Sequence, residues 1–431
     1  MDPEVNLIRQ QFPNQWPQYL RSVQINGLRG WSGQVVRFDF PVTVIAGENG
    51  SGKSTVLKVA ACAYGPPNNQ ARSFYPGTFF PDTAWEQSAN VTLTYDVRQG
   101  PNNVTYSLTK PTQRWRRMDQ RRTRNVVWQD ISRTLPLDAT AGYARIAKRT
   151  ANETATADLN APFLTRLRSV MGRHYQQARM AEADIDPGRR VGIVRLGGHD
   201  FSQFHQGAGE DATLDLMTLF QNVPQHALVL IDEVEASLHP RSQRRLIHFL
   251  LWLSRTRRVQ VILSTHSEHV LEELPPEGRV FISRGAAGVD VVDAVSPNFA
   301  LNRMDDPNHP LLYVLTEDTE AGILVTEMLR QNGTELTGIR FLDVGPANVV
   351  RALGTLAAQD RLPFETVCIQ DGDQQNAPGC IQLPGNQAPE IQVFNDILNN
   401  AMPQLAARLE IGQPAVTDAL NGAMALIDHH E

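Results

Sequence analysis

The sequence has no long apolar segment and few cysteines, and each of these features argues against a class of protein. No stretch approaches the ~20 consecutive apolar residues that are needed to cross a bilayer. Residues 1–11 mix charged and polar side chains where a secretory signal needs a continuous apolar region. Three cysteines, Cys62, Cys368 and Cys380, are widely spaced, which favours reduced thiols over disulfides or a zinc site. We therefore expect a cytoplasmic protein with no membrane partner.

Positive charge is scarce overall but is concentrated in one segment. The net charge of −6 gives no global reason to expect nucleic-acid binding. Residues 114–124 nevertheless contain six arginines and Trp115, and Trp128 follows shortly afterwards. A solvated loop and an arm that contacts phosphates are both compatible with this composition.

The length of 431 residues predicts two domains. For residues 1–300 we expect a buried strand at 42–46, a helix directly after it, a hairpin of 91–97 and 104–108, strands at 227–231 and 259–263, and a helix from Pro240 to Leu253. We interpret residues 111–190 as a helical, basic insertion. For residues 308–431 we expect strands at 312–315, 339–342 and 366–369 alternating with helices at 321–329 and 347–356, which indicates a parallel sheet.

A glycine-rich loop follows the first buried strand and reads Gly-Glu-Asn-Gly-Ser-Gly-Lys-Ser over residues 47–54. Such a loop between a strand and a helix directs backbone N–H groups at phosphate oxygens, and the helix N-terminus favours their negative charge. Lys53 can neutralise the β- and γ-phosphates, and the Ser54 hydroxyl can bind magnesium. The sequence therefore predicts ATP and Mg²⁺ as ligands. The expected contact residues are Asn49, Gly50, Gly52, Lys53, Ser54 and Thr55.

A second motif is the apolar strand 228–231, which ends in Asp232 and Glu233. Hydrolysis requires a carboxylate for the metal and a group that activates water. We expect Asp232 to hold the magnesium together with Ser54, and Glu233 to act as the general base.

These motifs resemble the ABC ATPase family, in the branch related to SMC and Rad-type proteins and to the AAA-like ATPases of bacterial defence. The resemblance covers residues 20–284. It extends to the segment Glu-Ala-Ser-Leu-His-Pro at 235–240, and to Ser-Thr-His-Ser at 264–267, which implies that His266 senses the γ-phosphate. Gln-Gly-Ala-Gly-Glu at 206–210 resembles a variant signature motif, with Gly207 where a serine is common. In this family the signature closes over the nucleotide of a second subunit, so Gly207 and Gly209 would contact ATP in at least a dimer.

The C-terminal region carries acidic residues after two of its expected strands. Glu317 follows the first strand, and Asp371 and Asp373 follow the strand 366–369, where an extended backbone would place both aspartates on one face. Three such carboxylates can bind magnesium for phosphodiester chemistry. The arrangement resembles the Toprim domain of the overcoming-lysogenisation-defect (OLD) nucleases and Gabija-type proteins, and residues 383–390 resemble the ATPases of the Septu and retron-associated type. The last resemblance implies a separate HNH nuclease partner.

The resemblances together imply an α/β protein: an ABC-type head with a mixed sheet and a helical insertion over residues 1–300, followed by a smaller Toprim-like domain over 308–431. Our first hypothesis is an ATPase subunit of an anti-phage defence or nucleic-acid-processing complex that regulates a partner nuclease through nucleotide-dependent engagement of its heads. The second is a self-contained OLD-like Toprim endonuclease that cuts DNA and is regulated by its ATPase domain. Both hypotheses allow DNA or RNA as a partner. An SMC-like tethering protein ranks last, because residues 111–190 lack sustained heptads.

Overall fold

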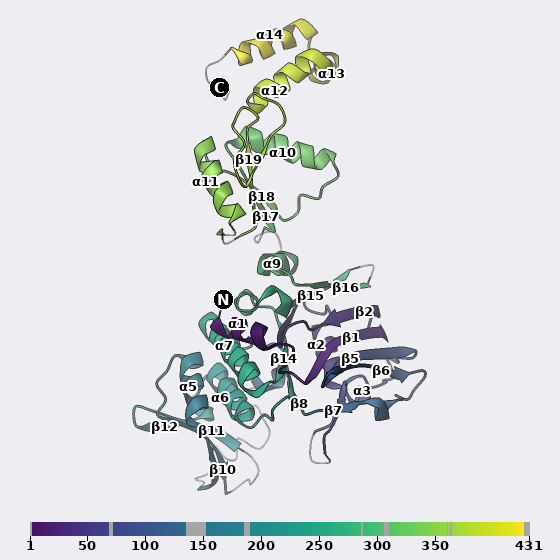
Figure 1. The fold of residues 1–431 in the computed structure, drawn as a ribbon, viewed down its shortest axis with the longest axis vertical. Helices are drawn as coiled ribbons and strands as arrows, with labels where there is room; N and C mark the ends of the chain where they lie inside the picture. The colour runs from purple at the N-terminus through teal and green to yellow at the C-terminus, as the bar shows by residue number, and fades with distance from the viewer. Residues whose placement is uncertain are drawn as a thin grey trace. The chain divides into compact units, whose positions relative to one another are not determined.

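The computed structural model describes residues 2–68, 72–134, 152–184, 190–285, 288–305, 310–359, 361–362 and 364–425. The chain divides into two compact units, unit 1 over Met1–Ala300 and unit 2 over Leu301–Glu431 (Figure 1). The division lies beside the segment where the sequence placed a domain boundary. Each unit contains its own sheets, and both are α/β in architecture.

A six-stranded sheet forms the centre of unit 1. Its order is β16 (Gly288–Asp293), β15 (Arg279–Gly285), β3 (Val42–Ala46), β14 (Gln260–Thr265), β13 (Leu228–Ile231) and β8 (Val126–Gln129). Five strands run parallel and β16 pairs antiparallel with β15, so the sheet is mixed as expected. Every residue of β3, β13 and β14 is buried, which explains their largely apolar sequences. The helices nearest these strands include α2 (Lys53–Ala61) and α7 (Pro240–Arg257).

An antiparallel sheet lies beside the central one, in the order β2 (Trp31–Arg37), β1 (Gln18–Leu28), β5 (Val91–Gln99) and β6 (Asn102–Lys110). Its hairpin β5–β6 confirms the expected pairing around Gly100. Alternate residues of β5 are buried, the pattern of a sheet with one face on the core. The smaller elements of unit 1 are α1 (Pro3–Gln11), β4 (Tyr64–Gly65), α3 (Pro76–Phe79), β7 (Arg122–Thr123) and α8 (Glu268–Leu271). The division between the units falls within α9 (Pro297–Asp305).

The expectation of a helical insertion over 111–190 is wrong for the described part of that range. It contains the strands β7, β8, β9 (Glu153–Asp158) and β10 (Gln177–Ala183), and the one α-helix described within it is α5 (Ala161–Met171). Strand β8 belongs to the central sheet, and β9 and β10 form a third sheet with β11 (Arg190–Leu196) and β12 (His199–Ser202). Helix α6 (Ala208–Gln221) packs against β11, and α5 packs against α6. Sheet pairing overrode the local helical preference of a polar sequence. Residues 135–151 and 185–189 of the range lie outside the described residues.

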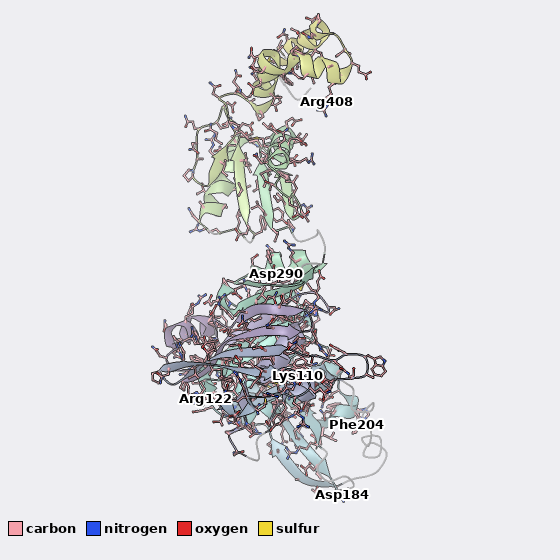
Figure 2. The ribbon with its side chains drawn as sticks, turned by 90° about the vertical axis from the view of Figure 1, so that its right-hand side faces the viewer. Lys110, Arg122, Asp184, Phe204, Asp290 and Arg408 are labelled. Carbon is pink, nitrogen blue, oxygen red and sulfur yellow. The ribbon has the colours of Figure 1, made fainter. Side chains whose placement is uncertain are left out.

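Arg121 and Arg124 have structural roles. Neither of the two interpretations of the arginine-rich segment, a solvated loop or an arm that contacts phosphates, included such a role. Arg124 is 2% exposed and donates hydrogen bonds to the carbonyl oxygens of His226 and Ala227 and to the side chains of Gln260 and Tyr64. These bonds join β7 to the start of β13 and to β14. Arg122, two residues earlier, is exposed at the outer side of unit 1 (Figure 2).

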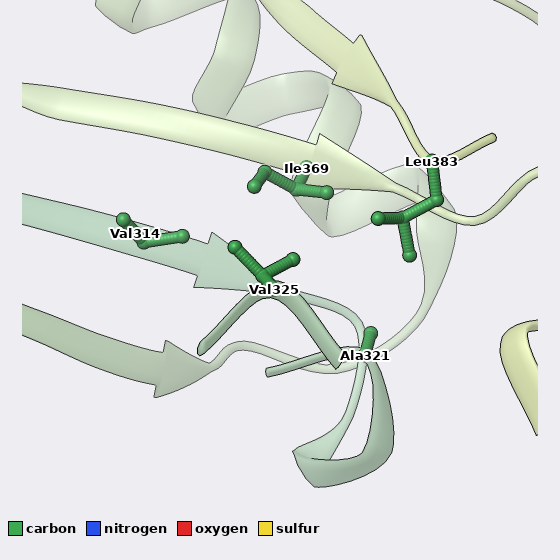
Figure 3. Close-up of a cluster of buried hydrophobic side chains, with 5 residues drawn as sticks. All are labelled: Val314, Ala321, Val325, Ile369 and Leu383. Atoms are coloured by element: carbon green, nitrogen blue, oxygen red, sulfur yellow. The ribbon is translucent and has the colours of Figure 1, made fainter. Parts of the chain in front are cut away.

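Unit 2 contains a parallel sheet of order β18 (Ile339–Asp343), β17 (Leu312–Thr316), β19 (Thr366–Gln370) and β20 (Cys380–Gln382). Helices α10 (Thr319–Gln331) and α11 (Ala347–Ala358) connect its strands, as the alternating sequence predicted. A core of buried side chains packs α10 against the sheet, and its members are Val314, Ala321, Val325, Ile369 and Leu383 (Figure 3). The chain then forms α12 (Pro389–Asp396), α13 (Met402–Leu409) and α14 (Gln413–Met424). Among the described helices of both units, none combines the length and apolarity that a bilayer span requires.

Candidate functional site

The phosphate loop lies between β3 and α2, where the glycine pattern placed it. Gly47, Gly50 and Gly52 have φ angles of 150°, 79° and 115°, which side chains rarely adopt. At Gly47 a Cβ atom would also lie 2.1 Å from the carbonyl oxygen of Ile282 on β15. The loop conformation therefore requires glycine for both backbone and packing reasons.

Lys53 crosses this loop at the first position of α2. Its Nζ donates to the carbonyl oxygens of Gly47 at 2.8 Å and Glu48 at 2.9 Å, and the residue is 5% exposed. Burial lowers the pKa of the ammonium, and the nearby carboxylates of Glu233 and Asp232 oppose that shift. The charge therefore stands at the mouth of the loop, where phosphates would be bound.

Two hydroxyl groups converge on Asp232, which directly follows β13. Ser54 Oγ lies 3.1 Å and Ser264 Oγ lies 2.6 Å from the same atom, Asp232 Oδ1. Ser54 is the second residue of α2 and Ser264 lies near the end of β14, so adjacent parallel strands and one helix meet here. A hydroxyl and a carboxylate at the carboxyl edge of a sheet form a suitable pair of oxygen ligands for Mg²⁺. The donor set thus fits the predicted metal.

Glu233 and His266 also lie together. Glu233 Oε1 is 3.3 Å from His266 Nε2, and the Glu233 backbone N–H donates to Ser264 Oγ at 2.8 Å. Glu233 has a φ of 52°, a left-handed conformation that is costly for a residue with a side chain. The backbone hydrogen bond to Ser264 fixes the turn that places the carboxylate beside the imidazole.

Glu235 is an additional residue whose role the sequence did not indicate. Its Oε1 accepts the backbone N–H of His266 at 2.5 Å, and burial raises the pKa of this carboxyl group. Next to His266, Ser267 donates from Oγ to Gln243 Oε1 at 2.6 Å. Both 235 and 264 lie within motifs that the sequence had singled out, but spacing alone does not reveal which hydrogen bonds they form.

A cavity of about 250 Å³ opens over the phosphate loop. Seven of the residues that line it were predicted from the sequence: Asn49, Gly50, Gly52, Lys53, Ser54, Thr55 and Glu233. Two further residues, Arg29 from the β1–β2 turn and Arg284 from β15, were not predicted. They lie far from the motifs in sequence and reach the rim only through strand pairing.

The signature-like glycines lie elsewhere in unit 1. Gly207 is the N-cap of α6 and Gly209 lies in its first turn, and neither is among the described residues that line the cavity. A Cβ atom at Gly209 would lie 2.2 Å from the carbonyl oxygen of Ser237, whereas one at Gly207 would meet nothing within 4 Å. Gly209 therefore lets α6 contact the segment 235–240, and Gly207 remains accessible.

The acids of unit 2 meet at the carboxyl ends of β17 and β19. Asp371 is 7% exposed, and its Oδ1 has no hydrogen-bond partner among the described residues. Burial, with the charges of Glu317, Asp318 and Asp373 close by, raises the pKa of Asp371 to about 7. Burial also raises the pKa of Glu317. The three predicted metal-binding acids thus lie near one another.

The local backbone at this acidic site differs from the expectation. The segment from Asp371 is a turn, closed by a hydrogen bond from the Gln374 N–H to the Asp371 carbonyl oxygen, so the two aspartates do not share the face of an extended strand. Asp371 is buried and Asp373 is exposed as a result. The small residue Gly372, whose Cβ would lie 3.1 Å from Gly385, permits the tight approach of the following loop.

A second acidic group in unit 2 was not predicted. Carboxylate oxygens of Asp318, Glu320 and Glu390 all lie within 4.8 Å of one another. Asp318 is also the N-cap of α10, where its Oδ1 accepts the Ala321 N–H at 2.8 Å. Glu390 comes from α12, so only the fold brings it to the other two.

Two protein-family models match parts of the chain. One, described as an AAA domain, matches residues 22–154 and so contains the phosphate loop. The other, described as "AAA domain, putative AbiEii toxin, Type IV TA system", matches residues 107–272 and contains Asp232 and His266. The two matches support an AAA-type P-loop ATPase domain in unit 1. No curated protein matches the chain.

Solved structures of SMC heads are similar to part of the chain. An SMC head bound to the C-winged helix domain of ScpA is 18% identical with a TM-score of 0.42, covering 64% of this chain and 98% of that chain. The SMC head domain from Thermotoga maritima is 16% identical with a TM-score of 0.35, with coverage of 64% and 98%. An Smc head with an extended coiled coil, bound to the C-terminal domain of ScpA derived from Pyrococcus furiosus, is 13% identical with a TM-score of 0.40, covering 73% and 100%.

Proposed function

We propose that unit 1 binds ATP with Mg²⁺ over the phosphate loop and hydrolyses the terminal phosphate. The observation that carries this proposal is the convergence of Ser54 and Ser264 on Asp232, directly beside the Glu233–His266 pair. The partial matches to AAA-domain models support the same reaction class. Such a site needs a phosphate cradle, a metal carboxylate and a base, and the described residues offer all three.

Each residue has a distinct role in this proposal. Lys53 and the loop N–H groups bind the phosphates, and Ser54 and Asp232 hold Mg²⁺, which supplies Lewis-acid stabilisation of the charge on the phosphate oxygens. Glu233 accepts the proton of the attacking water as the oxygen bonds to the terminal phosphorus and ADP leaves. His266, 3.3 Å from Glu233, orients that carboxylate and is placed to contact the terminal phosphate.

We further propose that two copies of the chain share their nucleotide sites and thereby regulate a partner nuclease. Gly207 is accessible at the N-terminus of α6 and does not line the cavity of its own chain. In a dimer this helix N-terminus would meet the terminal phosphate bound by the other copy, where its dipole favours negative charge. Hydrolysis would remove that contact and release the heads, a change that a bound HNH nuclease could follow.

Sedimentation velocity of the Glu233→Gln variant tests the shared site. This variant should retain ATP but not cleave it, so with ATP and Mg²⁺ it should sediment as a dimer or a larger complex, and with ADP it should return to the species seen without nucleotide. Glu268→Gln, which removes an acid near His266 outside the proposed chemistry, is the matched control. Identical sedimentation of Glu233→Gln with ATP and with ADP would refute nucleotide-dependent engagement.

A second function, metal-dependent cleavage of nucleic acid by unit 2, is favoured by one specific observation. The buried Asp371 Oδ1 lacks a hydrogen-bond partner among the described residues while other carboxylates crowd around it. Buried carboxylates of this kind are stabilised by a bound cation. Glu317, Asp371 and Asp373 would hold the metal, with Asp318, Glu320 and Glu390 as an adjoining group of oxygen ligands.

Incubation of the full chain with plasmid and linear DNA and Mg²⁺ or Mn²⁺, with and without ATP, tests whether unit 2 cleaves DNA. A self-contained nuclease should cut, and Asp371→Asn should abolish cutting while ATP hydrolysis by unit 1 continues. If the wild type cuts neither substrate under any of these conditions, unit 2 does not cleave DNA alone. The hypothesis of a separate partner nuclease would then remain.

A further inference from the structure

We propose that an exposed arginine face on unit 1 binds the phosphates of a nucleic-acid strand. We define the arginine face as Arg72, Arg114, Arg116, Arg117 and Arg122, all of which are exposed. It combines the arginine-rich segment of the sequence with residue 72, which comes from a different part of the chain. Neither ATP hydrolysis nor the acidic site of unit 2 uses these residues.

Hydrogen bonds from the half-buried Arg121 and the buried Arg124 hold the arginine face in place. Arg121 Nη1 donates to the carbonyl oxygens of Tyr64 at 3.1 Å and Phe74 at 2.9 Å, which ties the segment around residue 72 to the arginine-rich segment. Arg124 fastens the end of the same segment to β13 and β14. Arg121 and Arg124 thus have structural roles, and their hydrogen bonds fix the backbone that carries the exposed arginines of the same segment.

Backbone pairing and packing complete this support. Arg122 pairs with Tyr64 in the short parallel β7–β4 ladder, and Arg116 forms a bridge with Thr109 at the end of β6. The Trp115 ring lies 3.7 Å from where a Cβ atom on Gly77 would be, so it packs against α3. The exposed guanidinium groups therefore project from an ordered surface, which lowers the entropy cost of binding.

The arginine face carries uncompensated positive charge. Within the described residues, none of its five arginines forms an ion pair, and the segment 111–124 contains one acid, Asp119. Three exposed arginines elsewhere in the chain differ from them, since Arg37, Arg190 and Arg330 each pair with an aspartate or glutamate. Exposed cations without acidic partners raise the local potential and favour a polyanion.

The composition of the surface favours nucleic acid over an acidic protein segment. Tyr75 is 49% exposed, and Arg121 lies 5.1 Å from the centre of its ring, so an aromatic side chain stands beside the cations. Arginines interspersed with an exposed aromatic residue suit a strand that offers both phosphates and bases, because guanidinium groups pair with phosphates and rings stack on bases. All the cations of the segment are arginine rather than lysine, which fits bidentate phosphate contacts.

Fluorescence anisotropy with labelled single-stranded DNA, duplex DNA and single-stranded RNA tests the proposal on the full chain. The test variant is the triple Arg114→Gln, Arg116→Gln, Arg122→Gln, in which none of the three side chains donates a described structural hydrogen bond. We expect its dissociation constant to rise at least tenfold. Three lost phosphate contacts should also reduce the slope of log K against log salt by about 2 to 3.

The matched control removes three ion-paired exposed arginines, Arg37→Gln, Arg190→Gln and Arg330→Gln, and so changes net charge equally. It should bind like the wild type, and thermal melting should show all three proteins folded. Equally weakened nucleic-acid binding in both triple variants would mean that net charge alone causes the effect, and would overturn the proposal. An unchanged affinity of the test triple would overturn it as well. Binding of poly-glutamate through the same arginines without binding of any nucleic acid would assign the face to an acidic protein and also overturn it. The strand type that binds most tightly identifies the partner.

Discussion

Ser264 donates its hydroxyl hydrogen to Asp232 Oδ1 at 2.6 Å. The same Oγ accepts the Glu233 N–H, so one side chain of β14 orients both acids that follow β13. Hydrogen bonds to a metal-binding carboxylate fix its direction, and their loss commonly costs ~10–100-fold in metal affinity or activity.

Ser264→Ala should therefore lower the rate of ATP hydrolysis by about 10–100-fold and raise the Mg²⁺ concentration needed for half-maximal rate. Steady-state phosphate release over a magnesium titration measures both. Ser254→Ala is the control, because Ser254 is equally buried and its hydroxyl bonds to the Val259 carbonyl oxygen instead. Equal losses in the two variants would mean that Ser264 supports only the fold.

Gly209→Ala and Gly207→Ala should separate packing from binding at the start of α6. The added methyl group at 209 would lie 2.2 Å from the Ser237 carbonyl oxygen, so we expect a fall of several degrees in Tm, in line with about 1–3 kcal/mol for overpacking. The methyl group added by Gly207→Ala would have no atom within 4 Å, so this variant should keep the wild-type Tm. If Gly207 contacts ATP of a second copy, this variant should still lose hydrolysis; a normal rate would exclude that contact.

The pair Asp211 and Asp215 in α6 predicts a pH dependence of stability. Burial raises the pKa of Asp211 to about 6, and burial plus the Asp211 charge raises that of Asp215 to about 7. The folded state therefore binds more protons than the unfolded state between about pH 4 and 7, and the free energy of unfolding should fall as pH rises through that window.

Asp215→Asn removes the larger of these shifts. Relative to the wild type, the variant should gain roughly 1–3 kcal/mol at pH 8 and little at pH 4. Urea unfolding at several pH values measures the difference. Asp290→Asn, at an exposed acid on β16, is the control. An offset for Asp215→Asn that does not change with pH would contradict the raised pKa.

Arg124→Gln should destabilise unit 1 by about 3 kcal/mol, because it removes the side-chain donors to the carbonyl oxygens of His226 and Ala227, and the latter keeps only the Gln260 N–H. Arg116→Gln, on the exposed arginine face, should stay within about 0.5 kcal/mol of the wild type. Chemical denaturation of both variants measures the contrast. Equal stabilities would mean that the Arg124 hydrogen bonds contribute little to the fold.

The strands and helices near the nucleotide site follow from local sequence. The apolar run of β3, the glycines after it and the proline that begins α7 each specify an element through short-range physics. The same holds for β17, α10 and β18 in unit 2, whose alternation along the sequence predicts the parallel pairing that β17 and β18 form.

Other features depend on contacts between distant residues. Strand β8 joins the central sheet beside β13, although its sequence lies in a polar stretch that favoured a helical interpretation. Likewise Arg29, Arg284 and Glu390 reach their sites only because the fold brings separate segments together. The turn at Asp371 shows the same limit, since an isolated acidic pair gives no signal for the loop that folds around it.

Steady-state phosphate release with and without Mg²⁺, by the wild type, Lys53→Ala and Asp232→Asn, tests the central claim most directly. The account predicts magnesium-dependent hydrolysis by the wild type, at least a ~100-fold loss in both variants and a wild-type rate in Glu268→Gln. A wild-type rate of hydrolysis in Lys53→Ala or Asp232→Asn would contradict the assignment of the Ser54–Asp232 site. A wild type that does not hydrolyse ATP would contradict it as well.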